Sequence, residues 1–353
     1  MPDRPGLLVT GSTGVLGRAL LPLLHRPDVV ALAHRASPER GVATLRGDLT
    51  RPRLGLDDGD YRRLADRTTT IVHAAAVTDF GAGDPATSAL NVDGTRRVLD
   101  LAAAAGARVL YVSTAFVDRA GHTPEGRGAR TWDGAATPTA YLTSKRRAED
   151  LVRGSGLDWA IARPSVVIGD SVTGEIARYQ GLHWLIRGIV RDEVPVIAGP
   201  AESPVDVVPA DVAARAVAAL VEGWLPGEHW LTAGPAAPTI EHLVDIVLQV
   251  AREHGRDPSA PRFMTQETVQ RLVRPVFIEP LPAGERRRFD DLTAMCSIFE
   301  GAPLVPTSLG TIPGGPPAPT RASVDAALEV TATAIARRVR AGRRALRGDE
   351  AAA

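Results

Sequence analysis

The sequence predicts an α/β protein with a doubly wound parallel sheet of the Rossmann type and a smaller, mixed and mostly helical substrate lobe. Two observations lead to this fold class. Short apolar runs alternate with helical patterns through the first 165 residues, which is typical of a parallel sheet covered on both faces. The first apolar run leads into three glycines spaced three apart, Gly11, Gly14 and Gly17, and glycine-rich turns of this kind are typical of dinucleotide-binding folds.

The predicted strands are short and apolar, and they lie at residues 7–10, 29–33, 42–45, 71–74, 109–113 and 159–162. Amphipathic patterns between them predict helices at residues 16–24, 61–66, 86–105 and 140–154. The third of these helices ends before Gly106, a residue suited to a helix C-cap. Six strands in this rhythm predict a nucleotide-binding domain over residues 1–165, with a returning segment near residues 204–222.

The second half of the sequence is looser, and residues 166–353 are expected to form the substrate lobe and a C-terminal helical extension. Helices are predicted near residues 181–190, 212–222 and 240–253. Residues 302–318 hold proline and glycine too densely for a helix or a central strand, so they predict an extended linker.

Composition limits the function classes. Lys plus Arg and Asp plus Glu both number 41, so no basic excess favours nucleic acid or an anionic membrane as a partner. The single cysteine, Cys296, excludes an intramolecular disulfide and fits a reducing cytoplasm. We find no leader pattern, no apolar run of about 18 residues and no metal-ligand cluster, so a cytoplasmic protein without a membrane span or a metal is expected.

The glycine turn has the features of a phosphate-binding loop. Gly11 allows a tight turn after the first strand, Gly14 lets the backbone approach a pyrophosphate, and Gly17 lets the following helix pack closely on the strand. The predicted cofactor contacts at this turn are Gly11, Thr13, Gly14, Val15, Leu16, Gly17 and Arg18.

The end of the second strand favours NADP over NAD. NAD-selective sites usually place an acidic residue there, whereas this chain has His34 and Arg35. A guanidinium suits a 2′-phosphate through forked hydrogen bonds, so Arg35 and Arg18 predict NADPH as the cofactor. The alternative is that these arginines are only solvated surface residues. After the third strand, Asp48 is predicted to accept from the adenine amino group beside Leu49, or to serve only as a turn residue.

Tyr141 and Lys145 lie four residues apart, on one face of a predicted helix, downstream of a strand that ends at Thr114. Reduction of a carbonyl leaves an alkoxide that needs a proton. An ammonium one helical turn away favours the phenolate form of a tyrosine and so tunes the phenol for proton exchange. Thr114 is placed to donate a hydrogen bond to the substrate oxygen, and Lys145 to reach the nicotinamide ribose. The sequence therefore predicts Thr114, Tyr141 and Lys145 as catalytic, with Lys145 also contacting the cofactor.

Seven motifs lie in order along about residues 6 to 215: Thr10-Gly11-x-x-Gly14-x-x-Gly17, Gly47-Asp48-Leu49, His73-Ala74-Ala75-Ala76, Asn91-Val92-x-Gly94-Thr95, Val112-Ser113-Thr114-Ala115, Tyr141-x-x-Ser144-Lys145 and Ala162-Arg163-Pro164-Ser165. As a set they resemble the extended short-chain dehydrogenase/reductases. The resemblance implies that Ala74 and Ala75 line the cofactor, that Pro164 and Ser165 lie beside the nicotinamide, and that Asn91 supports the active-site helix.

Two segments, residues 73–80 and 112–117, resemble one branch of that family: fatty acyl-CoA reductases and the reductase domains that end carboxylic acid reductases and nonribosomal peptide synthetases. The resemblance implies NADPH-dependent reduction of an acyl thioester to an aldehyde or alcohol, with a small-molecule or carrier-bound acyl substrate. A free aldehyde or ketone is an equal alternative as substrate, and the chain is expected to be a monomer or homodimer.

Two other functions stay open. One is a nucleotide-sugar epimerase or dehydratase, or a hydroxysteroid-type dehydrogenase, of the same superfamily. The other is a non-catalytic NADP-binding regulator, although the presence of both Tyr141 and Lys145 argues against it.

Overall fold

The computed structural model describes residues 6–24, 27–34, 41–79, 83–121, 139–301 and 303–351. The chain forms two compact units. The first consists of Met1–Val167, Asp211–Thr232 and Pro306–Ala318, and the second of Ile168–Ala210, Ala233–Val305 and Pro319–Ala353.

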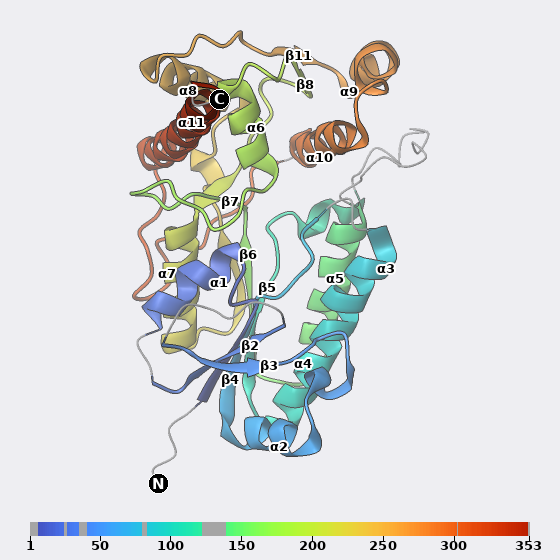
Figure 1. Ribbon diagram of the computed structural model, residues 1–353. Helices are drawn as coiled ribbons and strands as arrows, with labels where there is room; N and C mark the ends of the chain where they lie inside the picture. Colours follow the sequence, from blue (N-terminus) through green and yellow to red (C-terminus); the bar gives the residue numbers. More distant parts are fainter. Residues whose placement is uncertain are drawn as a thin grey trace. The chain divides into compact units, whose positions relative to one another are not determined.

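The first unit is built on a seven-stranded parallel sheet of order β10-β6-β5-β4-β1-β2-β3 (Figure 1). Its strands are β1 (Gly6–Thr10), β2 (Val29–Ala33), β3 (Ala43–Arg46), β4 (Thr68–His73), β5 (Arg108–Val112), β6 (Trp159–Pro164) and β10 (Gly227–Leu231). The six predicted strands are confirmed, with shifts at their ends. The seventh, β10, was not predicted, because Glu228 and His229 interrupt its apolar pattern.

Helices cover both faces of this sheet, with α4 (Asp93–Ala105) and α5 (Thr139–Arg153) on one side and α1 (Val15–Leu20) and α7 (Ala210–Glu222) on the other (Figure 1). The shorter helices are η1 (Leu21–Leu23), η2 (Pro52–Gly55), α2 (Asp58–Arg67), α3 (Gly83–Thr87), η4 (Ser88–Val92) and η5 (Val117–Gly121). The predicted helix 86–105 is divided by the π-turn η4, and its C-cap is confirmed at Gly106, which has φ 63°. The predicted helix 16–24 becomes α1 followed by a 3₁₀ turn that contains Pro22.

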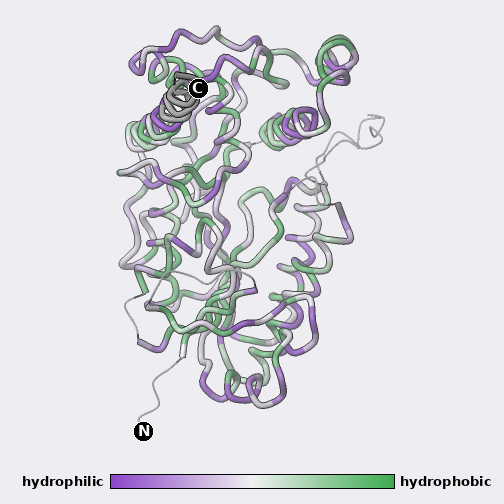
Figure 2. Tube along the Cα trace, viewed as in Figure 1, coloured by the Kyte–Doolittle hydropathy of each residue, from purple (hydrophilic) through white to green (hydrophobic). Residues whose placement is uncertain are grey.

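The central strands are buried and aliphatic, and Figure 2 shows hydrophobic residues gathered along them. Leu7, Leu8 and Val9 of β1 are at most 1% exposed, as are Ile71 and Val72 of β4. Because the strands are parallel, their carboxyl ends lie at one edge of the sheet, where the loops that follow them meet.

The second unit contains the helices α6 (Gly181–Val190), η7 (Gly234–Ala236), α8 (Ile240–Glu253), α9 (Gln266–Thr268), η8 (Val269–Ile278), α10 (Ala283–Phe299) and α11 (Arg321–Ala351), with strands β8 (Val196–Ala198), β9 (Val207–Pro209) and β11 (Arg262–Met264). The short strand β7 (Val166–Ile168) lies where the chain passes from the first unit to the second. The predicted helices 181–190 and 240–253 are confirmed, whereas η8 and α10 were not predicted.

Residues 303–318 contain neither helix nor strand. They are nevertheless packed, because Leu309 and Ile312 are buried and the Ser308 hydroxyl accepts from the amide of Trp230 at 3.0 Å. Across the described ranges, no helix is both long and apolar enough to cross a membrane.

Candidate active site

The glycine turn between β1 and α1 is tightly packed against the loop that follows β4. Gly11 has φ +74°, and a Cβ there would lie 2.5 Å from the carbonyl carbon of Ala74. A Cβ on Gly17 would lie 2.2 Å from the Gly11 oxygen, which also accepts from the Gly14 amide at 3.0 Å. The structure therefore brings the predicted glycines together with Ala74 and Ala75.

The other predicted residues of the turn differ in what they offer. The Nε atom of Arg18 donates to the carbonyl of Thr13 at 3.2 Å, so Arg18 folds back over the turn. Val15 is half-buried and begins α1, whereas the Leu16 side chain is buried in the core, which leaves only its backbone for a cofactor. Arg35 lies outside the described residues.

The turn fits a dinucleotide. Within the described part of the chain, the buried hydroxyl of Ser12 has no hydrogen-bond partner, and buried polar groups normally have one. The same holds for Ser165, which follows the end of β6 and whose amide donates to Leu231 at 3.1 Å. Both hydroxyls are suited to polar groups of a bound ligand.

Asp48 lies in a turn after β3. Its Oδ1 atom accepts from the amide and the hydroxyl of Thr50 at 2.9 and 2.6 Å, and the Thr50 hydrogen bond lowers the pKa of this carboxyl. Its Oδ2 atom lies 3.7 Å from His34 and 3.5 Å from Arg51. The geometry is that of a turn residue, while the contact to adenine predicted for Asp48 and the neighbouring buried Leu49 stays a prediction.

Thr114 and Tyr141 meet at the carboxyl edge of the sheet. Thr114 follows β5, where the amide of the next residue, Ala115, donates to the carbonyl of Pro164 at 2.9 Å. Tyr141 lies in the first turn of α5, and the Thr114 hydroxyl hydrogen-bonds its phenol. The loop after β5, the end of β6 and the start of α5 thus place two hydroxyl groups side by side.

Burial raises the pKa of Tyr141 to about 12, and the hydrogen bond from Thr114 opposes the rise. The sequence led us to expect a phenol tuned toward the phenolate by Lys145. The structure gives the opposite direction, because the loss of water around the phenol disfavours the phenolate more strongly than the Thr114 hydrogen bond favours it. Tyr141 is therefore a neutral phenol near neutral pH, which suits a proton donor.

Lys145 is buried one turn further along α5. Its Nζ atom donates to the Val112 carbonyl at 2.8 Å and to the Tyr111 hydroxyl at 3.3 Å, and it lies 4.8 Å from the centroid of the Tyr111 ring. Burial lowers the pKa of Lys145 to about 7, against the opposing effect of Glu149. Lys145 is also the only lysine in the sequence, since the other 40 basic residues are arginines.

Asn91 fastens α5 to the loop after β4. Its amide accepts from the Val77 amide at 2.8 Å and donates to the Val77 carbonyl at 3.0 Å and to the Ser144 hydroxyl at 2.9 Å. Ser144 in turn donates to the carbonyl of Tyr141 at 2.7 Å. This arrangement matches a supporting role for Asn91.

Sequence reasoning missed a buried ion pair behind Lys145. Arg163 of β6 forms a two-fold hydrogen bond with Glu149 of α5, at 2.9 and 2.6 Å, and both side chains are at most 3% exposed. Arg153 and Glu228 extend the cluster toward the surface. The position of Glu149, one helical turn after Lys145, was the available signal.

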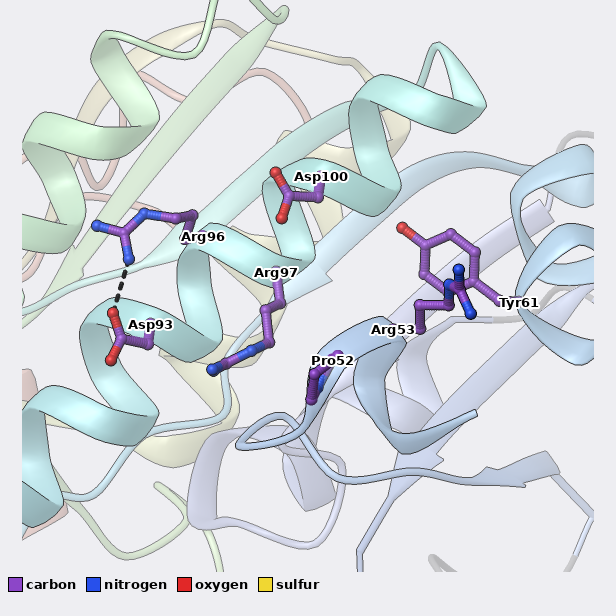
Figure 3. A pocket seen from close by; sticks show the side chains of 7 residues that line it. All are labelled: Pro52, Arg53, Tyr61, Asp93, Arg96, Arg97 and Asp100. Atoms are coloured by element: carbon purple, nitrogen blue, oxygen red, sulfur yellow. Dashed lines mark hydrogen bonds and ion pairs between the residues drawn. The ribbon is translucent and has the colours of Figure 1, made fainter. Parts of the chain in front are cut away.

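A separate pocket of about 300 Å³ lies among η2, α2 and α4 (Figure 3). It is lined by Pro52, Arg53, Tyr61, Asp93, Arg96, Arg97 and Asp100. It contains none of the predicted catalytic or cofactor residues, and Arg96 is paired with Asp93 at 2.7 Å. Among the described residues, no group of three or more His, Cys, Asp or Glu residues is placed to hold a metal.

Comparison with known families gives the class of protein. Residues 30–217 match the NAD-binding family described as male sterility protein, and this match covers more than half of the chain. The chain belongs to this family and is an oxidoreductase of the extended short-chain dehydrogenase/reductase type.

Individual relatives are parts of larger proteins or share the fold. The chain is 31% identical over 244 residues to a linear gramicidin synthase protein of Brevibacillus parabrevis, a match that covers 60% of this chain but 5% of that protein. The terminal R domain of the myxalamid PKS-NRPS pathway superposes with a TM-score of 0.71 at 24% identity, over 96% of this chain and 92% of that domain. A UDP-glucose 4-epimerase from Thermotoga maritima gives a TM-score of 0.61 at 16% identity, over 95% and 99% of the two chains, so the fold alone does not select the reaction.

Proposed function

We propose that this protein uses NADPH to reduce an acyl thioester to an aldehyde and a free thiol. The observation that carries the proposal is the hydrogen-bonded pair of Thr114 and Tyr141 at the carboxyl edge of the sheet. Two adjacent hydroxyl donors are what the developing oxyanion of a carbonyl needs. The sequence relationship to a gramicidin synthase supports a thioester, carried by CoA or a carrier domain, as the source of that carbonyl.

The nicotinamide ring, when bound, supplies the hydride that reaches the carbonyl carbon. Thr114 and Tyr141 hydrogen-bond the carbonyl oxygen, and the Tyr141 phenol gives its proton to that oxygen as negative charge develops there. The Lys145 ammonium stabilises the phenolate that remains, and a proton from solvent restores it. The hemithioacetal then loses its thiol, so that thioester, NADPH and one proton give aldehyde, thiol and NADP⁺, and a second round would give the alcohol.

The residues suited to the cofactor are those of the glycine turn and its neighbours. The backbone of Gly11, Gly14 and Gly17 would hold the pyrophosphate, and Arg18 is tethered to the same turn. The end of β2 continues from Ala33 to His34 without a carboxylate, which supports NADPH rather than NADH.

Turnover assays with purified protein test the proposed reaction. NADPH oxidation is followed with acyl-CoA, carrier-bound acyl groups, free aldehydes and ketones, and a UDP-sugar serves as the substrate of the competing epimerase hypothesis. Tyr141→Phe is expected to lose a factor of about 10² to 10⁴ in rate, while the matched control Tyr61→Phe keeps wild-type activity. Full activity of Tyr141→Phe, or conversion of the UDP-sugar without thioester reduction, would overturn the proposal.

Direct binding measurements test the choice of cofactor. Arg18→Ala and Arg35→Ala are each expected to weaken NADPH binding about tenfold through the loss of a charged hydrogen bond, with little effect on NADH. Arg51→Ala is the control, since Arg51 is directed at Asp48. An unchanged ratio of NADPH to NADH affinity in both variants would remove these arginines from the selection of NADPH.

A further inference from the structure

A row of buried polar side chains lies near the carboxyl ends of three neighbouring strands, β1, β4 and β5. The register pairs Thr10 of β1 with His73 of β4, and His73 with Tyr111 of β5. All three side chains are at most 1% exposed. Burying polar groups is unfavourable unless each finds a hydrogen-bond partner, so the row calls for an explanation beyond packing.

The hydrogen bonds of this row can be assigned a direction. Thr95 of α4 donates its hydroxyl proton to the Asn91 carbonyl at 2.6 Å, so it must accept from His73 Nε2 at 3.1 Å. His73 Nδ1 then accepts from the Thr10 hydroxyl at 2.7 Å, and Thr10 accepts from the Ala75 amide at 3.3 Å. The direction is inferred from the requirement that every group be satisfied.

Tyr111 joins this row to the active site. Its hydroxyl hydrogen-bonds Thr95 and also receives a hydrogen bond from Lys145 at 3.3 Å. Because the ammonium form of Lys145 can only donate, the Tyr111 proton is then directed to Thr95 and a lone pair is presented to the ammonium. Burial raises the pKa of Tyr111 well above its usual value, so the phenol stays neutral and keeps this orientation.

We propose that Tyr111 is a positioning residue of the active site: held by Thr95 and His73, it orients the side chain of Lys145 and favours its ammonium form through a hydrogen bond and its ring face. This inference rests on the proposed function, in which Lys145 stabilises the Tyr141 phenolate. In the proposed mechanism Tyr111 itself contacts neither substrate nor cofactor.

Other titratable groups near Lys145 also bear on its protonation. Glu149, on the same helix, favours its ammonium form, although the charge of Glu149 is shared with Arg163 of β6. His73 of β4 stays neutral, because burial and the nearby Lys145 charge lower its pKa to about 3. Of the groups that contact Lys145, only the Tyr111 hydroxyl and the Val112 carbonyl accept a hydrogen bond from it within the described structure.

The single lysine makes a direct test possible. Protein labelled with ¹³C at lysine Cε gives one side-chain signal, and its chemical shift against pH reports the pKa of Lys145 without any turnover. In Tyr111→Phe the aromatic ring stays, but the hydroxyl that accepts a hydrogen bond from Lys145 is lost. The midpoint of the Lys145 titration is therefore expected to move down by about one pH unit. The fall of kcat at alkaline pH is expected to move in the same direction.

A second pair of variants covers the case in which Tyr111→Phe does not fold. Thr95→Val keeps the shape of the side chain but removes the acceptor that orients the Tyr111 proton, so it should lower the midpoint partially, and Thr95→Ser should restore it. An unchanged Lys145 midpoint in Tyr111→Phe, or in Thr95→Val where only that variant folds, overturns the inference. So does a loss of rate that is equal at every pH.

The two proposals can fail separately. If the wild-type protein reduces no thioester but the Lys145 midpoint moves in Tyr111→Phe, the proposed function fails and the positioning role stands. If the wild-type protein reduces thioesters but the midpoint and the pH profile stay fixed, only the positioning role fails.

Discussion

The two sides of the carboxyl edge of the sheet are built by different means. On the side of β1, β2 and β3, the candidate cofactor contacts are mainly backbone groups of a glycine turn, together with the exposed side chain of Arg18. On the side of β4, β5 and β6, the candidate catalytic contacts are the side chains of Thr114, Tyr141 and Lys145, which are hydrogen-bonded to one another or to neighbouring groups. Buried polar side chains behind them are hydrogen-bonded as well. Cofactor binding on the first side should therefore be most sensitive to substitutions that add atoms to the glycine turn. Stability and activity on the second side should be most sensitive to substitutions that remove a hydrogen-bond partner.

The largest effect is expected from the catalytic side. Glu149→Gln removes the fully buried charged partner of Arg163 and leaves the guanidinium only the partly exposed Glu228, so it should lower the free energy of unfolding by about 3 kcal/mol. Asp60→Asn, which breaks the exposed pair with Arg63, should cost about 0–1 kcal/mol. Urea unfolding monitored by circular dichroism measures both, and equal losses in the two variants would contradict the contrast between buried and exposed charges.

The buried row also predicts a dependence of stability on pH. The pKa of His73 is about 3 in the folded protein, below its usual value of 6.5, so the unfolded chain binds more protons between these values. The stability contribution is present above pH 6.5 and is lost as the pH falls toward 3, by about 1.4 kcal/mol per pH unit.

Between pH 6.5 and 5, His73 should thus account for about 2 kcal/mol of lost stability. Unfolding measured at both pH values should show a smaller difference in His73→Gln than in the wild type, whatever the absolute stability of the variant. A difference of the same size in both proteins would show that His73 is charged or exposed.

The smallest of these effects is expected on the cofactor side, where substitutions in the glycine turn should weaken the binding of NADPH. Gly17→Ala places a Cβ 2.2 Å from the Gly11 oxygen, whereas the Cβ of Gly14→Ala lies 3.2 Å from the same atom. NADPH affinity, measured by fluorescence titration, should fall about tenfold or more in the first variant and less in the second. If Gly14→Ala were the more damaging substitution, close approach of the ligand rather than packing of α1 would dominate the turn.

Local patterns allowed much of the fold to be predicted. Aliphatic strands and a glycine turn are encoded by neighbouring residues, so six strands and the positions of Gly11, Thr114 and Tyr141 followed from sequence. The edge strand β10 did not, because Glu228 faces the Arg153 and Arg163 guanidinium groups and breaks the apolar run. The Arg-rich helix α10 lacked a clear apolar stripe in the same way.

The electrostatics of the site could not be predicted from spacing. The pKa of Tyr141 depends on how much water its phenol loses, which only the assembled fold determines. The role inferred for Tyr111 depends on strands from three separate parts of the sequence lying in register. Contacts between residues as distant in sequence as positions 10, 73 and 111 produce no local sequence pattern from which they could be predicted.

The placement of the only lysine has a practical consequence for proteolysis. A lysine-specific protease has one target in this sequence, the peptide bond after Lys145, and that bond lies in the interior of α5. A folded helix has to open before a protease can cut it. The rate of this single cleavage would therefore measure how often the helix that carries Tyr141 unfolds.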